Sequence, residues 1–355
     1  MMSCPMPHRL ATLACALCLL APAAAPAAEP PAPVALNLAS APAALAAEHL
    51  EVSDAALLKG VRRLAIPLFS VQFVTGDQVS AETSGFAAAG RARSSAFYTL
   101  AGVGEADFQA LAAALYQRLV QSLTEAGLEV VPSEQVLASP TWQKLAATGV
   151  PAPLRNEHSI TVAPPGMAIY GVNKMAAGQG SRQAGGGLLA SLGAMGEVAT
   201  VIGSAFDTAP LQQELGGATL MEVNLRVHFV KLSNHNKGLL GRLASTAEVS
   251  GKAYPSIQTA SATLRTAHSG TTLSLKQPLA LDPSAIAEVR EEAKSGGEIA
   301  GAIAAGLLRM AIGNKDSESS ARFQAVADPQ RYRSVVGEGL GTVGQMFAAR
   351  IKAAN

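Results

Sequence analysis

The sequence predicts an α/β protein of the mixed α+β type, in which amphipathic helices cover a mixed parallel and antiparallel sheet that carries Gly/Ala-rich insertions. Three observations lead to this prediction: a strand, helix and strand within residues 62–131, a strictly alternating strand at 221–232, and a helical apolar stripe at 331–354. The 355 residues are 49% hydrophobic and 15% charged. A chain of this composition can form a large core, which excludes intrinsic disorder for most of its length.

The first 28 residues have the features of a secretory signal peptide. His8-Arg9 supplies a basic start, residues 10–20 are apolar, and small residues at 23–28 form a cleavage site. The apolar run is too short to span a membrane, although an uncut anchor is the alternative. All three cysteines of the chain lie in this segment: Cys4, Cys15 and Cys18. We therefore expect an exported protein, periplasmic and possibly associated with the outer membrane, whose mature chain has no thiol chemistry.

Residues 29–60 are predicted to be an Ala/Pro-rich linker, because prolines cluster directly after the cleavage site. Residues 61–355 are predicted to form a single α/β domain with insertions at about 75–103 and 150–218. The first insertion is poor in charge, and its pattern fits either a loop or a flat hairpin.

The domain begins with a predicted β-α-β unit. Residues 62–74 are apolar on both faces, as in a strand that is covered on both sides. A helix over 105–126 follows, with apolar residues at helical spacing and Gly127 at the position of a C-terminal cap. Residues 128–131 form the next strand, which we expect to pair in parallel with the first. A further helix is predicted from 133 to about 147.

The second insertion contains a long apolar segment at 188–206, with Glu197 as its only charge and with a small-residue surface. Such a helix can approach another backbone closely, in water or in lipid. The glycines at 185–187 precede it and are read as a linker rather than an anion site.

The late part of the chain supplies the antiparallel strands. At 221–232 apolar residues alternate with Glu222, Asn224, Arg226 and His228, which predicts one buried face and one solvent-exposed face. Strands at about 246–254 and 257–267 and a turn into 271–275 follow. Helices are predicted at 283–294, 298–312 and 331–354, the first with Asp282 as its N-cap.

No catalytic, cofactor-binding or metal-ligating residues are predicted, and no cofactor. His49, His158, His228, His235 and His268 are scattered, without the spacing of a zinc protease. The elbow of exported serine hydrolases is absent, and Gly251-Lys252 lacks the glycine spacing of a P-loop. Glu291-Glu292 is read as a solvated helix face. The net charge of +1 argues against a nucleic-acid partner.

The order of the apolar segments 64–69, 108–123 and 128–133 resembles the amino-terminal domain of the Tol translocation protein and the curli-secretion channel subunit family. In that family the late strands, here 221–275, complete a mixed sheet. The resemblance implies a non-enzymatic periplasmic role in partner binding or assembly. Channel members carry a lipidated N-terminal cysteine, and neither Cys15 nor Cys18 has the Leu-rich approach that such a signal needs.

The function we expect is therefore that of an exported, non-enzymatic envelope protein that acts through protein–protein contacts in outer-membrane or secretion-related assembly. Its partners would be envelope proteins, with self-association as one possibility. Two alternatives stay open. One is an oligomeric membrane-associated or membrane-inserting protein that uses 188–206, and the other is an exported hydrolase of unrecognised type.

Overall fold

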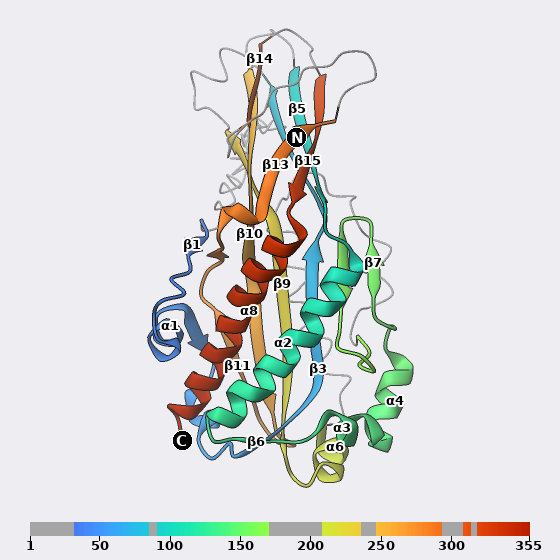
Figure 1. The fold of residues 1–355 in the computed structure, drawn as a ribbon, viewed down its shortest axis with the longest axis vertical. Helices are drawn as coiled ribbons and strands as arrows, with labels where there is room; N and C mark the ends of the chain where they lie inside the picture. Colours follow the sequence, from blue (N-terminus) through green and yellow to red (C-terminus); the bar gives the residue numbers. More distant parts are fainter. Residues whose placement is uncertain (1–31, 85–90, 170–207, 236–245, 293–307, 314–317) are drawn as a thin grey trace, which may run out of the picture. The chain divides into compact units, whose positions relative to one another are not determined.

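The computed structural model describes residues 32–84, 91–169, 208–235, 246–292, 308–313 and 318–355, and they form the mixed α/β fold that the sequence predicts (Figure 1). The predicted signal peptide with its cysteines, the glycines at 185–187 and the apolar segment 188–206 lie outside the described residues. Within the described part, the strands form one large mixed sheet and a second sheet of four strands.

The large sheet is built around two long antiparallel strands, β9 (Thr219–His235) and β10 (Thr246–Arg265). On one side β9 pairs in parallel with β3 (Arg63–Val74). Outside β3 lie β8 (Ser159–Val162) and β7 (Leu154–Asn156). The remaining strands are β1 (Val34–Ala35), β2 (Leu50–Val52), β6 (Glu129–Val130), β11 (Gly270–Leu275), β12 (Leu279–Ala280) and β14 (Leu308–Gly313). The predicted parallel pairing of β3 with β6 is confirmed.

The second sheet has the strand order β13 (Ile286–Glu291), β15 (Glu318–Ala327), β5 (Arg91–Ala101) and β4 (Gly76–Ser84). Of the two structures that the pattern allowed for the first insertion, the structure has the hairpin, formed by β4 and β5. This sheet packs on the large sheet through a separate apolar cluster that contains Tyr98 and Phe323 of the second sheet and Phe229 and Val230 of β9.

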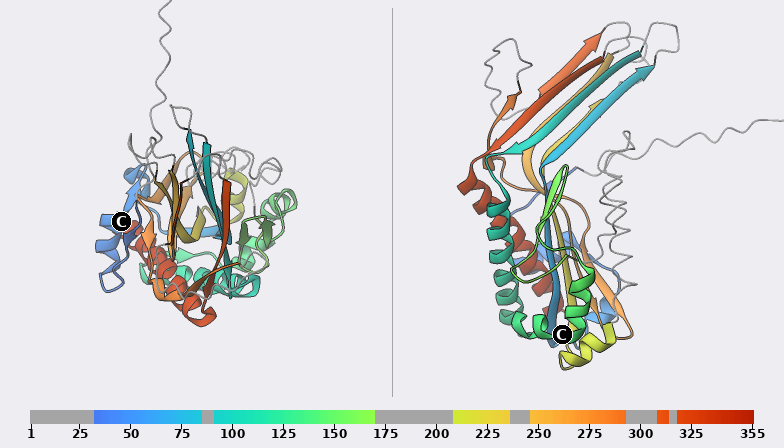
Figure 2. Two further views of the ribbon diagram at one scale, coloured as in Figure 1. Left: turned by 90° about the horizontal axis from the view of Figure 1, so that it is seen from above. Right: turned by 90° about the vertical axis from the view of Figure 1, so that its right-hand side faces the viewer.

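Two long helices, α2 (Glu105–Glu125) and α8 (Pro329–Lys352), lie side by side over one face of the large sheet (Figure 1, Figure 2). Both were predicted. The carboxylate of Asp107 accepts a hydrogen bond from the Gly104 N–H at the start of α2, and that of Asp328 accepts one from the Arg331 N–H at the start of α8. Gly127 follows α2 with φ of +89°, the left-handed conformation of a C-terminal glycine cap.

The main core lies between this helix pair and the sheet. The rings of Phe73 on β3 and Phe108 on α2 stack with centroids 4.3 Å apart, and Phe108 also contacts Tyr332 on α8. On the opposite face, near the start of β3, the short helices α3 (Ser133–Ala138), α4 (Pro140–Thr148) and α6 (Thr208–Glu214) pack against the sheet. The predicted single helix over 133–147 is thus divided in two at Ser139-Pro140.

The predicted linker at 29–60 is wrong for most of its length. Helix α1 (Pro42–His49), β2 and the 3-10 turn Ala55–Leu58 contribute Leu45, Leu50 and Leu58 to the core. Proline in this range does not indicate a linker, because Pro42 occupies the first turn of α1, where the missing N–H of proline is not needed.

Three predictions for the late chain are also corrected. The two strands at 246–254 and 257–267 are one strand, β10, with irregularities in its pairing between 253 and 259. In place of the helix at 283–294, Asp282 caps a single 3-10 turn (Pro283–Ala285) and β13 follows, because half-buried Ile286 and Val289 pack with the second sheet. Of the helix predicted at 298–312, the described residues 308–312 are in β14.

Candidate functional site

The side of β9 that carries polar residues is buried, which corrects the prediction of a solvent-exposed face. Met221, Val223, Leu225 and Val227 enter the main core as predicted. On the other side, however, Glu222 is 2%, Arg226 8% and His228 3% exposed. The alternating pattern located the two faces of the strand but could not tell whether the polar face is covered.

Neighbouring strands meet this polar face with polar groups of their own. The hydroxyl of Ser70 on β3 donates a hydrogen bond of 2.8 Å to the Asn224 side-chain oxygen. Glu222 lies 3.2 Å from the guanidinium Nε of Arg265 on β10, so the buried carboxylate has a cation beside it. Burial raises the pKa of Glu222, and Arg265 opposes that rise. Buried polar groups of this kind are tolerated because they have partners.

The most unusual contact lies at the start of β4, where the chain passes from β3 in the large sheet into the second sheet. Asp77, the second residue of β4, has its Oδ2 atom 3.8 Å from Nδ1 of His228 on β9. Burial raises the pKa of Asp77 to about 6. A hydrogen bond from the Gln78 backbone N–H and the charges of Arg226 and His158 act in the opposite direction. Burial and the charge of Arg226 lower the pKa of His228 to about 3. At neutral pH the cluster therefore holds a carboxylate, a guanidinium and an uncharged imidazole.

The turn between β7 and β8 fixes the start of β4. The backbone N–H groups of Thr75 and Gly76 donate to the carbonyl oxygen of His158 at 2.8 and 3.1 Å. A Cβ atom on Gly76 would lie 2.7 Å from Nδ1 of His158. A side chain at position 76 would displace the His158 ring, so His158, which sequence spacing left without a role, packs closely on the start of β4 beside Asp77.

On the other side of His228, β10 contributes Ser256 and Gln258. Ser256 is the register partner of His228, and its hydroxyl oxygen accepts a 2.8 Å hydrogen bond from Nε2 of Gln258. Both ring nitrogens of His228 and the Gln258 Oε1 atom are buried without a hydrogen-bond partner among the described residues. The pairing irregularities of β10 fall on either side of this pair, and such irregularities re-aim side chains.

An acid, an imidazole and a serine hydroxyl are the components of a nucleophilic triad, but their placement here does not fit one. Ser256 is 1% exposed, and its hydroxyl oxygen already accepts from Gln258. A nucleophile must reach its substrate, so these residues do not form an accessible reaction centre. The geometry is that of a polar joint between two sheets.

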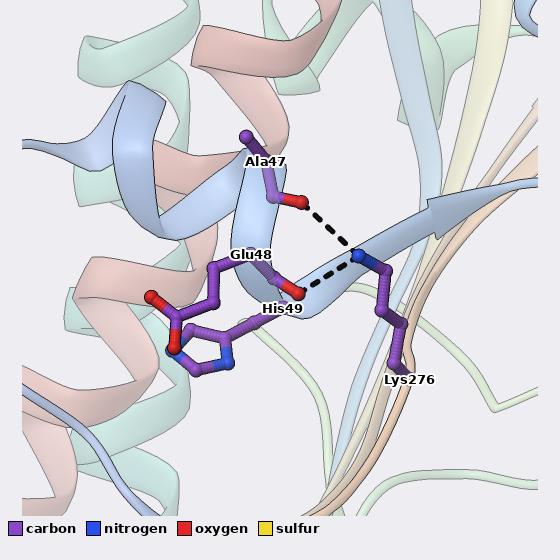
Figure 3. A network of polar contacts seen from close by, with 4 residues as sticks. All are labelled: Ala47, Glu48, His49 and Lys276. Atoms are coloured by element: carbon purple, nitrogen blue, oxygen red, sulfur yellow. Dashed lines mark hydrogen bonds and ion pairs between the residues drawn. The ribbon is translucent and has the colours of Figure 1, made fainter.

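The other residues considered from the sequence have structural positions. His49 is buried at the end of α1, where the Lys276 ammonium group donates to the carbonyl oxygens of Ala47 and Glu48 at 3.0 and 2.8 Å (Figure 3). Lys276 directly follows β11, so these two hydrogen bonds hold the carboxyl end of α1 against the end of that strand. A cation is also favourable at a helix C-terminus. His268 is exposed in a turn, and Glu291-Glu292 ends a strand rather than lying on a helix.

A second candidate surface is the pair of outer strands of the four-stranded sheet. Within the described residues, β4 pairs only with β5 and β13 pairs only with β15. Strand β13 carries the exposed charged residues Glu288, Arg290 and Glu291, which discourage pairing with another strand. Strand β4 has two charged residues, Asp77 and Glu82, and the residues between them, including Gln78 and Ser80, are uncharged. The edge of β4 is thus the less protected of the two.

Neither the chemistry of the described residues nor the comparison with known proteins assigns a function to the chain. In the described part of the chain, no helix has the length and apolar character needed to cross a membrane. The described residues likewise contain no group of three or more His, Cys, Asp or Glu side chains arranged to hold a metal ion. No family model, no curated protein and no solved structure matches the chain.

Proposed function

We propose that the chain is an exported, non-enzymatic envelope protein that acts through protein–protein contacts in outer-membrane or secretion-related assembly. The observation that carries this proposal is the open edge of β4, a strand that pairs on one side only within the described residues. An open edge presents unpaired backbone N–H and C=O groups, which can accept a strand from another chain.

Self-association is the specific form of contact that the four-stranded sheet favours. Its two outer strands, β4 and β13, lie on opposite sides of the same sheet. When the β4 edges of two copies pair, both chains use the same surface, and the contact closes as a twofold-symmetric dimer. The exposed charged residues of β13 discourage strand pairing at the opposite edge of the sheet, which leaves β4 as the edge for the contact.

The predicted signal peptide and the resemblance to the Tol and curli-secretion families support an envelope location and an assembly role. The proposed location is tested by fractionation of cells that express the full chain. Recovery in the cytoplasmic fraction alone would contradict it.

The contact surface is tested with a charge on the β4 edge. We expect the full-length chain, purified from the envelope fraction, to have a mass above that of the monomer by light scattering at micromolar concentrations. Ser80→Lys places a charge on the half-buried β4 edge and should shift the protein to monomers. Ser334→Lys places the same charge on the exposed side of α8 and is the matched control. A monomeric wild-type chain, or equal effects of the two substitutions, would contradict self-association through β4.

A further inference from the structure

The backbone groups of β4 alternate between the partner strand β5 and the open edge. The carbonyl oxygen of Thr75, directly before β4, accepts a 2.8 Å hydrogen bond from the N–H of Leu100 on β5. The C=O and N–H of one trans peptide group point in opposite directions, so the N–H of Gly76 points away from β5. There it donates to the His158 carbonyl oxygen at 3.1 Å. The even-numbered residues of β4 therefore present their backbone groups to the open edge.

The open part of this edge begins after Gly76, whose N–H is already used. The next residues with outward backbone groups are Gln78, Ser80, Glu82 and Ser84. Gln78 is exposed and Ser80 is half-buried. Two residues that face each other in an antiparallel pair exchange both backbone hydrogen bonds only when each points its groups at the other strand. An added antiparallel strand must therefore meet the even-numbered residues of β4 with outward-pointing residues of its own.

We propose that the β4 edge is self-complementary and binds a second copy of this chain in one antiparallel register, in which Ser80 of each copy faces Ser80 of the other on the twofold axis. The proposal rests on the self-association proposed above and specifies which residues meet. Gln78 of each copy then faces Glu82 of the other, and each facing pair of even-numbered residues can exchange two backbone hydrogen bonds. Asp77 faces Thr83 on the opposite face of the strand pair, so no two carboxylates face each other.

The two neighbouring registers that also pair even-numbered residues are less favourable. An axis at Val79 places Glu82 opposite Gly76, and that pair lacks one hydrogen bond because the Gly76 N–H already has an acceptor. An axis at Ala81 places the two Glu82 residues diagonally across the strand pair, about 7–8 Å apart, where like charges are unfavourable. With the axis at Ser80, the two Glu82 residues are about 14 Å apart along the strand.

The same pairing explains why assembly would stop at two copies. It joins two four-stranded sheets into one continuous sheet that has β13 at both ends. Strand β13 carries the exposed charges of Glu288 and Arg290, and a charged edge discourages further strand pairing. Because both copies use the same edge, the contact closes as a dimer and leaves no second β4 edge open.

Cysteine cross-linking in the full chain tests the register. Residues that face each other in a hydrogen-bonded antiparallel pair have Cα atoms about 5.5 Å apart, which a disulfide can span. With oxidised glutathione, we expect Ser80→Cys to form a covalent dimer by itself. Gln78→Cys and Glu82→Cys should each give no covalent dimer alone and should form one when they are mixed.

All cross-linking variants carry serine in place of Cys4, Cys15 and Cys18, so that only the introduced thiols can react. Ser334→Cys, on the exposed side of α8, is the matched control and should give no covalent dimer. A wild-type chain that is monomeric by light scattering would overturn the self-association and the register together. A dimer in which Ser80→Cys does not cross-link would overturn the register alone.

A second measurement changes the charge that faces Glu82. Gln78→Lys places an ammonium group opposite Glu82 of the other copy, twice in each dimer. Facing opposite charges stabilise a strand pair, so the dissociation constant of the dimer, measured by sedimentation, should fall by about twofold to thirtyfold. Gln78→Glu places like charges opposite each other and should raise the constant by a similar factor. Equal effects of the two substitutions, or a tighter dimer with Gln78→Glu, would overturn the register whether or not the Ser80→Cys chain folds.

Discussion

Helix α8 contains four glycines, and the structure predicts that replacing two of them with alanine has opposite effects on stability. A Cβ atom on Gly344 would lie 3.5 Å from the nearest atom, Cδ1 of Leu119, which is an ordinary van der Waals contact. A Cβ atom on Gly339 would lie 2.5 Å from Cδ2 and 3.0 Å from Cδ1 of Leu281. Leu281 is buried, so its side chain has little room to move away.

The magnitudes follow from helix propensity and packing. Alanine is favoured over glycine inside a helix by about 1 kcal/mol, so Gly344→Ala should raise the free energy of unfolding by about that amount. For a domain of this size that corresponds to a rise in Tm of about 2–4 °C. Gly339→Ala gains the same propensity but forces a methyl group into a filled space, which costs about 1–3 kcal/mol. We expect a net loss of about 1 kcal/mol at position 339.

Urea unfolding monitored by circular dichroism measures both effects, and an unchanged m-value shows that the unfolded state is the same. Leu281→Val provides a further check, because a smaller side chain at 281 should reduce the loss caused by Gly339→Ala. Destabilisation by Gly344→Ala, or equal stabilisation by both glycine substitutions, would refute the packing described for α8.

Three further predictions concern other parts of the core, each measured by urea unfolding. Phe108→Ala removes the ring that stacks on Phe73 and should cost about 3–5 kcal/mol, and a loss below 1 kcal/mol would contradict its full burial. Gly251→Ala should destabilise by about 1–3 kcal/mol, because its Cβ would lie 2.5 Å from the Tyr98 ring. Arg265→Met leaves the Glu222 carboxylate buried without its cation and should cost about 3–5 kcal/mol at neutral pH. Since burial raises the pKa of Glu222, this last loss should shrink as the pH falls, and a loss that does not depend on pH would argue against ionised Glu222.

Elements whose pattern and caps agree with their packing could be predicted from the sequence. Helix α2 has a regular apolar stripe, an acidic first turn and Gly127 at its end, and all three features are present in the structure. Helix α8 was predicted equally well despite its glycines, because its apolar stripe is long. In both helices the local signals and the tertiary contacts favour the same conformation.

Predictions failed where tertiary pairing outweighed a local signal. Asp282 and Pro283 do begin a helical turn, but Ile286 and Val289 pack better in the second sheet than on a helix. Residues 42–58 were assigned to a linker by their prolines and alanines, whereas three leucines in that range reach the core. Composition alone could not reveal that contact.

The polar joint at Asp77 and His228 was outside the reach of sequence reasoning for a different reason. Its two residues are far apart in the chain, and they meet only because β3 continues into β4 at the point where β9 passes. The strict alternation of β9 would be the same with its polar face in solvent or covered. Arginine and glutamate side chains are mostly exposed in proteins, so Glu222 and Arg226 on this face favoured the solvent-exposed interpretation.

The contact between Gly102 and Ala327 has a mechanical consequence. Gly102 lies between β5 and α2 with φ of +87°, and a Cβ there would be 2.2 Å from the carbonyl oxygen of Ala327, the last residue before the cap of α8. Strands β5 and β15 pair in parallel, and each leads directly into one of the two long helices. A force applied to the edge of β4 would therefore pass through β5 and its neighbour into both helices at one point. The four-stranded sheet should therefore move together with α2 and α8. Binding at the edge of β4 would shift these two helices against the main core.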